Sequence, residues 1–94
     1  SKFLRLVTMT GSYLEGIQQY EKALEYFQKG LEVDNLAEEF YQHLMVCYRE
    51  LGRKAEAMAV YNRCCGVLSS TLGADPSPAT ESLYSSLRHH SGEA

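Results

Sequence analysis

The chain has 94 residues, of which 45% are hydrophobic and 22% charged, the composition of a folded domain rather than of a disordered segment. A chain of this length has room for one hydrophobic core. No stretch approaches the ~20 apolar residues that a membrane-spanning helix requires, so no such helix and no membrane partner are predicted. The net charge is −3 with scattered basic residues, whereas a protein that binds nucleic acid by itself needs clustered positive charge.

The cysteines and the N-terminal residues indicate the compartment. Three cysteines are an odd number, and Cys64 and Cys65 are adjacent, unlike the spread cysteines of a small secreted domain. Arg5 interrupts the only apolar stretch near the N-terminus, so no signal peptide is predicted. We therefore expect a reducing, cytoplasmic location. Because the first residue is Ser1 and not methionine, we also expect a piece of a longer protein.

Apolar residues recur at three- and four-residue steps through most of the chain, which is typical of helices with one buried face. No proline precedes Pro76, and no useful alternating pattern predicts a β-strand. The sequence therefore predicts an all-α fold. The apolar stripes are, in chain order, Phe3, Leu6, Val7, Thr10 and Leu14; Tyr20, Ala23, Leu24, Phe27 and Leu31; Phe40, Leu44, Cys47, Tyr48 and Leu51; and Ala57, Met58, Tyr61, Cys64, Cys65, Leu68 and Leu72.

Capping residues mark the predicted ends of these helices. Asn35 stands three residues before Glu38, which resembles the capping box of a helix start. Gly52 and Gly73 each follow an apolar stripe. Each glycine can adopt the left-handed conformation that ends a helix.

The two prolines of the chain predict a separate last helix. Pro78 follows Ser77, and proline at the first helical position after a serine cap is common because its missing N–H is not needed there. We expect this helix over about residues 78–88. The polar residues 89–94 are expected to form a frayed tail.

The sequence repeats itself with a constant period. Small residues coincide where two helices must approach closely, and bulky residues coincide where a gap must be filled. The period is that of the tetratricopeptide repeat, whose helix–turn–helix units recur about every 34 residues. The coinciding pairs are Ala23 with Ala57, Phe27 with Tyr61, Gly30 with Cys64, Leu14 with Tyr48 and Val7 with Tyr41.

We therefore expect two antiparallel helix pairs, repeat one over residues 4–37 and repeat two over residues 38–71. The units differ in the turn between their helices: Gln18 stands where the second unit has Gly52, and Gly16 comes two positions early. The turn of the first unit is therefore the boundary that the pattern defines least.

One segment narrows the resemblance to a family. The stretch from Leu51 to Tyr84, with its Pro76-Ser77-Pro78 turn before Thr80, is similar to the bacterial transcriptional activator domain. That domain is the tetratricopeptide-like partner of a winged-helix DNA-binding domain in regulators of the antibiotic-regulatory-protein type. The resemblance implies such a domain over residues 1–88, folded as a short right-handed superhelix of helix pairs with a C-terminal capping helix. It also implies bacterial origin and a winged helix outside this chain.

Tetratricopeptide helices stack and curve, and the first helix of each pair lines the concave side. One interpretation of this side is a binding site for an extended or helical peptide, and the other is a solvated face without a partner. It lacks the lysine, asparagine and arginine set that clamps C-terminal carboxylates, so that ligand is not expected. By repeat position, the predicted concave face consists of Arg5, Thr8, Ser12, Gln42, Val46 and Arg49.

No motif supports catalysis, and we predict no catalytic residue, cofactor or metal. Cys64 and Cys65 lack the spacing of a zinc knuckle and fall on an apolar stripe, so we expect buried cysteines that act as small hydrophobic residues, as we do for Cys47. His43 has no serine or cysteine partner that would make an activated nucleophile. No glycine-rich phosphate-binding loop occurs.

We predict a protein-interaction and regulatory module of a bacterial transcription activator. Its partner would be a second copy, RNA polymerase or another regulatory domain, and it would reach DNA only through a domain absent from this chain. A general tetratricopeptide scaffold unconnected with transcription is the alternative, and a ligand-sensing segment of an enzyme is a third. About three repeats make a self-supporting stack. With two and a half, we expect either marginal stability or a homodimer that covers the open N-terminal face.

Overall fold

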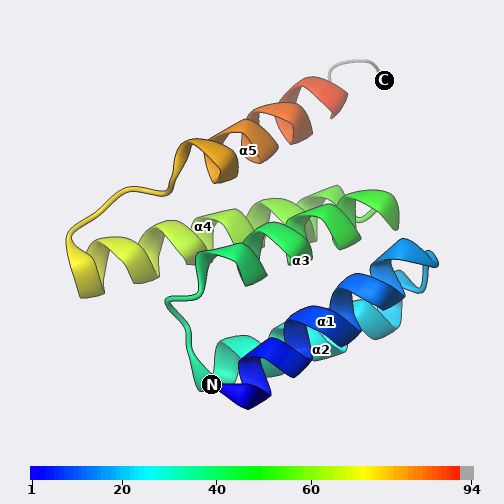
Figure 1. Ribbon diagram of the computed structural model, residues 1–94. Helices are drawn as coiled ribbons and strands as arrows, with labels where there is room; N and C mark the ends of the chain where they lie inside the picture. Colours follow the sequence, from blue (N-terminus) through cyan, green and yellow to red (C-terminus); the bar gives the residue numbers. More distant parts are fainter. Residues whose placement is uncertain (92–94) are drawn as a thin grey trace.

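The computed structural model describes residues 1–91, and every regular element in this range is an α-helix (Figure 1). The predicted all-α class is confirmed. The helices of the described residues are α1 (Lys2–Gly16), α2 (Tyr20–Val33), α3 (Glu38–Glu50), α4 (Lys54–Leu72) and α5 (Pro78–Ser91).

The helices form two antiparallel pairs followed by a single helix. α1 packs on α2, α3 packs on both α2 and α4, and α5 lies against α3 and α4. Figure 1 shows α1 and α3 on one side of the molecule with α2 and α4 behind them. The molecule measures 41 × 36 × 18 Å, so its shortest dimension is about two helices thick. Because α5 packs on α3 and α4, it lies where the first helix of a third pair would lie.

The turns inside the two pairs have the same backbone geometry. In the first turn the N–H of Gln19 donates to the carbonyl of Leu14 at 2.8 Å. In the second turn the N–H of Arg53 donates to the carbonyl of Tyr48, also at 2.8 Å. Gln18 has a φ angle of 63° and Gly52, its repeat equivalent, a φ angle of 74°. The first turn, which the sequence defined least, thus has the left-handed residue at the same repeat position as the second.

Gln18 is the one non-glycine residue with a positive φ angle in the range 1–91. Because a side chain in the left-handed region costs about 1 kcal/mol, we expect Gln18→Gly to raise the free energy of unfolding by about 0.5–1 kcal/mol. Urea denaturation measures this change. The control is Gln19→Gly one position later, where φ is −90° and glycine relieves no strain. An equal effect of the two substitutions would contradict the assignment of strain to Gln18.

The start of α3 differs from the predicted capping box. Ala37 occupies the N-cap position, and no described side chain caps this helix end, so the prediction for Asn35 is wrong. The chain bends earlier, because the Asp34 side chain accepts the N–H of Leu36 at 3.0 Å. Asn35 therefore lies two residues before the cap position, which Ala37 occupies. The carboxylate of Glu38 is used elsewhere, on the start of α5.

The ends of the last two helices agree with the sequence in part. Gly73 ends α4 in the left-handed conformation with a φ angle of 61°, as predicted. α5 begins at Pro78 as predicted but continues to Ser91. The predicted end at residue 88 was too early because neither proline nor glycine interrupts the chain before Gly92. The remainder of the expected frayed tail, residues 92–94, lies outside the described residues.

The core lies where the two helix pairs meet. Phe27, Phe40 and Tyr41 are its largest fully buried side chains, and Ala23 and Ala57, which coincide in the repeat, are fully buried as well. The predicted stripes of α2, α3 and α4 supply most of this core. Aromatic rings from one pair therefore fill the space against the other.

The predicted stripe of α1 divides between two faces. Val7 is buried and Leu14 packs against the core, whereas Phe3 and Leu6 are exposed. The expectation that all of these residues share one buried face is therefore wrong. α1 packs mainly on α2. This contact covers one face of α1, so the apolar residues on its other face stay exposed.

Candidate functional site

Two hollows lie along the junction of α1 and α3. The first, the His43 hollow, has a volume of about 370 Å³ and lies between the C-terminal half of α1 and the C-terminal half of α3. The second, the Arg5 hollow, has a volume of about 380 Å³ and lies between the start of α1 and the start of α3. Because both lie along the same helix junction, we refer to the two hollows together as the strip.

His43 forms a polar link between the two helix pairs. Its Nδ1 lies 2.8 Å from Oε1 of Glu15 on α1. Its ring stacks on Phe27 with 4.4 Å between the ring centroids and an interplanar angle of 2°. The imidazole is therefore fixed on one face by a ring and at one edge by a carboxylate. It defines the wall of the first hollow.

Five of the six predicted concave-face residues line these hollows. Ser12, Val46 and Arg49 line the His43 hollow, and Arg5 and Thr8 line the Arg5 hollow. The structure thus brings these residues of α1 and α3 together along one strip.

The sixth predicted residue, Gln42, lies apart from the strip. Its Nε2 donates to the hydroxyl of Thr80 on α5 at 2.9 Å, and Thr80 is fully buried. Gln42 is therefore engaged in holding α5 and not in lining either hollow. The contact of Gln42 with Thr80 was not predicted, because no sequence pattern shows which residues of α5 lie opposite which residues of α3.

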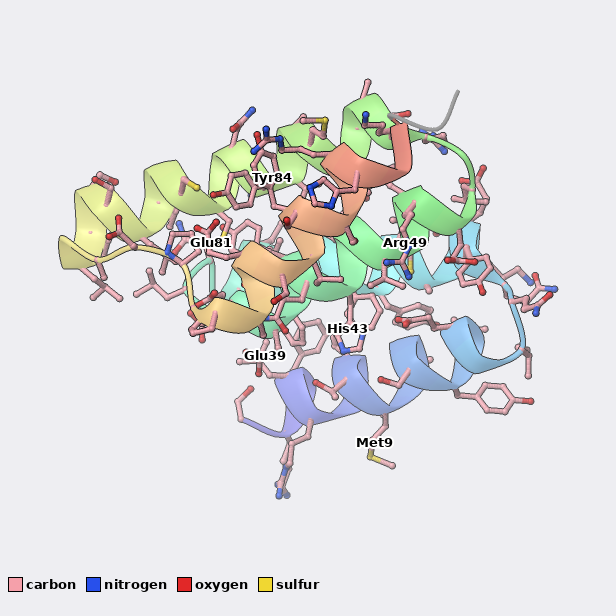
Figure 2. All side chains as sticks on the ribbon, turned by 90° about the horizontal axis from the view of Figure 1, so that it is seen from above. Met9, Glu39, His43, Arg49, Glu81 and Tyr84 are labelled. Atoms are coloured by element: carbon pink, nitrogen blue, oxygen red, sulfur yellow. The ribbon has the colours of Figure 1, made fainter. Side chains whose placement is uncertain are left out.

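The charges along the strip are mixed. Figure 2 shows Glu39, His43 and Arg49 following one another along α3, whereas Met9 projects from the opposite side of α1. Arg49 has its Nε 3.2 Å from the carboxylate of Glu50. Opposite signs alternate over a short distance, so the strip suits a partner segment with both charges rather than a strongly acidic or basic one.

Several strip residues were missed at the level of sequence. Glu15 and His43 belong to different helix pairs, and no sequence motif joins them. A signal does exist: Thr8, Ser12 and Glu15 are spaced at four and three residues, which places them on one face of α1. Extending the predicted concave face by one turn would have included Glu15.

The cysteines do not contribute reactive groups to this face. Cys47 and Cys64 are fully buried, and burial raises the pKa of each thiol to about 12. Both therefore stay protonated near neutral pH. Cys65 is half-buried. Among residues 1–91 no group of three His, Cys, Asp or Glu side chains could hold a metal ion.

None of the described helices is long and apolar enough to span a membrane. No curated protein and no solved structure matches the chain. The family model of the bacterial transcriptional activator domain matches residues 1–88, which include both helix pairs and most of α5. The resemblance seen in the sequence is thereby confirmed, and the chain belongs to the family of bacterial transcriptional activator domains.

Proposed function

We propose that this domain is the protein-interaction module through which a bacterial transcription activator is regulated. The family is one of transcription-activator domains, a regulatory family and not an enzyme family. The observation that carries the proposal is the strip of two hollows between α1 and α3. A strip of this form can hold a helix or an extended segment of another protein.

The module acts by holding its partner in a fixed position relative to a DNA-binding winged helix outside this chain. The partner is RNA polymerase, another regulatory domain or a second copy, and the site of action is the cytoplasm. Val46 offers an apolar contact, and Arg5, Arg49 and Glu39 offer charges of both signs. Recognition needs no cofactor and no catalytic residue.

Filling the His43 hollow tests this role. Ser12 is an exposed residue of α1 that lines the hollow, so Ser12→Arg blocks it without touching the core. In the native gene we expect the transcripts that depend on the activator to fall about tenfold, since an arginine without a matching partner costs about 1.4 kcal/mol or more of binding. The transcripts are first defined by deleting the gene, and RNA sequencing measures them.

The matched control is Ser69→Arg, the same substitution at an exposed position of α4. It is expected to leave the transcripts unchanged. Equal losses from both substitutions, or no loss from Ser12→Arg in a protein of normal abundance, would contradict a role for the strip.

A general tetratricopeptide scaffold unconnected with transcription is the second candidate. The coding sequence before Ser1 separates the two. A winged-helix segment there supports the transcription activator, and further helix pairs in its place support the scaffold.

A further inference from the structure

α1 has a second apolar face that the fold leaves exposed. Phe3, Leu6, Tyr13 and Ile17 lie at heptad spacing with Thr10 between them, at successive steps of three and four residues. We call these five residues and the adjacent Met9 the α1 stripe. Apart from Thr10, its members are large hydrophobic side chains that are 44–69% exposed. Heptad spacing is the pattern by which one helix packs along another.

The repeat assigns a role to this stripe. Leu6 coincides in the repeat with Phe40, and Tyr13 coincides with Cys47, and both of these equivalents are fully buried. Phe40 is packed against the first helix pair, with its ring centroid 5.8 Å from that of Phe27. The α1 stripe therefore occupies the positions that, in the second pair, dock on a neighbouring pair. Among the described residues this docking face has nothing against it.

We propose that the α1 stripe binds a second copy of the chain, with the two α1 helices antiparallel about a two-fold axis near Thr10. The inference deepens the proposed role as an interaction module, and it assigns a surface and an orientation to self-association. The stripe is centred on Thr10, so each Phe3 end lies near the Ile17 end of the other copy. One face thus serves both copies, as a two-fold interface requires.

Charge favours the antiparallel arrangement. α1 has Lys2 and Arg5 near its start, no acidic residue in its first turn and no basic residue in its last turn. Parallel helices would place these cations beside their own counterparts. Antiparallel helices place them beside the other copy's C-terminal carbonyl groups, where the helix dipole favours positive charge.

Among the described side chains of α5, at the opposite end of the stack, none is a large hydrophobic residue as exposed as those of the α1 stripe. Ser82, Ser85 and Ser86 are exposed on α5, and Ser86 donates to the carbonyl of Leu83 at 2.8 Å. A head-to-tail contact from the α1 stripe to this end would pair apolar with polar residues. The stripe is therefore expected to give a closed dimer and not a growing fibre.

The size of the stripe sets the strength of the dimer. Five half-exposed side chains cover roughly 500 Å² per copy, against about 800 Å² per partner in stable complexes. We therefore expect a reversible dimer with a dissociation constant of the order of micromolar to tens of micromolar.

Sedimentation equilibrium of the chain between about 1 and 200 µM tests the proposal, since this range brackets the expected constant. Leu6→Glu is expected to leave a folded monomer at every concentration, because Leu6 is 59% exposed. Leu72→Glu is the matched control on α4, where the exposure is 58%, and it is expected to dimerise like the parent. A monomeric parent, a dimer that survives Leu6→Glu, or equal loss in both variants would overturn the proposal.

Disulfide cross-linking tests the orientation. Thr10→Cys lies near the proposed axis and is expected to form a covalent dimer on oxidation, relative to the unsubstituted chain. Lys2→Cys is expected to form none, because antiparallel helices separate the two Lys2 positions by about 24 Å along the axis. Cross-linking at Lys2 would overturn the antiparallel arrangement. Ser12→Arg is expected to leave the dimer intact, because Ser12 lines the His43 hollow and is not part of the α1 stripe. A failure of the proposed partner site between α1 and α3 and a failure of the proposed dimer therefore give different results.

Discussion

Replacing Gly11 by alanine lowers the free energy of unfolding by about 2 kcal/mol, although alanine is the better helix former. A Cβ atom at Gly11 would lie 2.5 Å from Cζ of Phe27 and 2.8 Å from each neighbouring ring carbon. The Phe27 ring cannot move away, because it is fully buried and stacked on His43. The added methyl group therefore forces α1 away from α2.

Gly66→Ala is the control, and it is expected to act in the opposite direction. Gly66 is an interior residue of α4, and apart from its chain neighbours and the backbone of its own helix no described atom lies within 4 Å of a Cβ built there. Alanine should raise the free energy of unfolding by about 0.5–1 kcal/mol through its helix propensity alone. Urea denaturation of both variants measures the two signs. Equal signs would contradict the close approach at Gly11.

A smaller ring partner should partly rescue the defect. Phe27→Leu by itself is destabilising, because it removes buried surface. In its presence the further loss caused by Gly11→Ala is expected to be smaller than in the parent, as a double-mutant cycle would show. Additive losses would mean that the methyl group collides with something other than the ring.

Replacing Glu38 by leucine lowers the free energy of unfolding by about 2–4 kcal/mol, because two donors at the start of α5 lose their acceptor. Oε2 of Glu38 accepts the N–H of Ser77 at 2.7 Å and also the hydroxyl of Thr80. Thr80 is fully buried, so its hydroxyl cannot turn to water. The control is Glu39→Leu, an exposed carboxylate in the same first turn of α3, with an expected loss of about 0.5 kcal/mol.

The same contact makes the domain sensitive to acid. Burial acts to raise the pKa of Glu38, but the hydrogen bonds from Thr80 and Ser77 outweigh it and hold the pKa below the ordinary value of 4.5. A lowered folded-state pKa contributes stability that is present above pH 4.5 and is lost as the pH falls through the folded-state pKa. Urea midpoints between about pH 6 and pH 2 measure this loss, and Glu38→Leu should flatten the curve. An unchanged slope in that variant would assign the acid sensitivity to other carboxylates.

The helices could be predicted because their causes are local. Apolar residues at three- and four-residue steps set each helix, and Gly52, Gly73 and Pro78 set three of the ends. The repeat period supplied the pairing, since it compares the chain with itself. Even the first turn followed the period, with Gln18 accepting a conformation that glycine adopts more easily.

What could not be predicted depends on contacts between distant segments. Helix α1 is apolar on two faces, and the periodicity of its sequence does not say which face the neighbouring helices cover. Gln42 belongs to the predicted concave face by repeat position, but the register of α5 engages it with Thr80. Glu15 and His43 meet only because the two pairs stack. Each of these outcomes follows from tertiary packing and not from any local pattern.

α3 touches each of the other four described helices, since it packs on α2, α4 and α5 and reaches α1 through His43 and Glu15. α1 and α5 each pack at one end of the stack, whereas loss of α3 would remove the packing of the second pair on α2 and of α5 on α3. The amide protons of α3 are therefore the last to exchange with solvent, and they report the global unfolding reaction. Those of the two outer helices report local opening, and a partner bound at either end would slow them first.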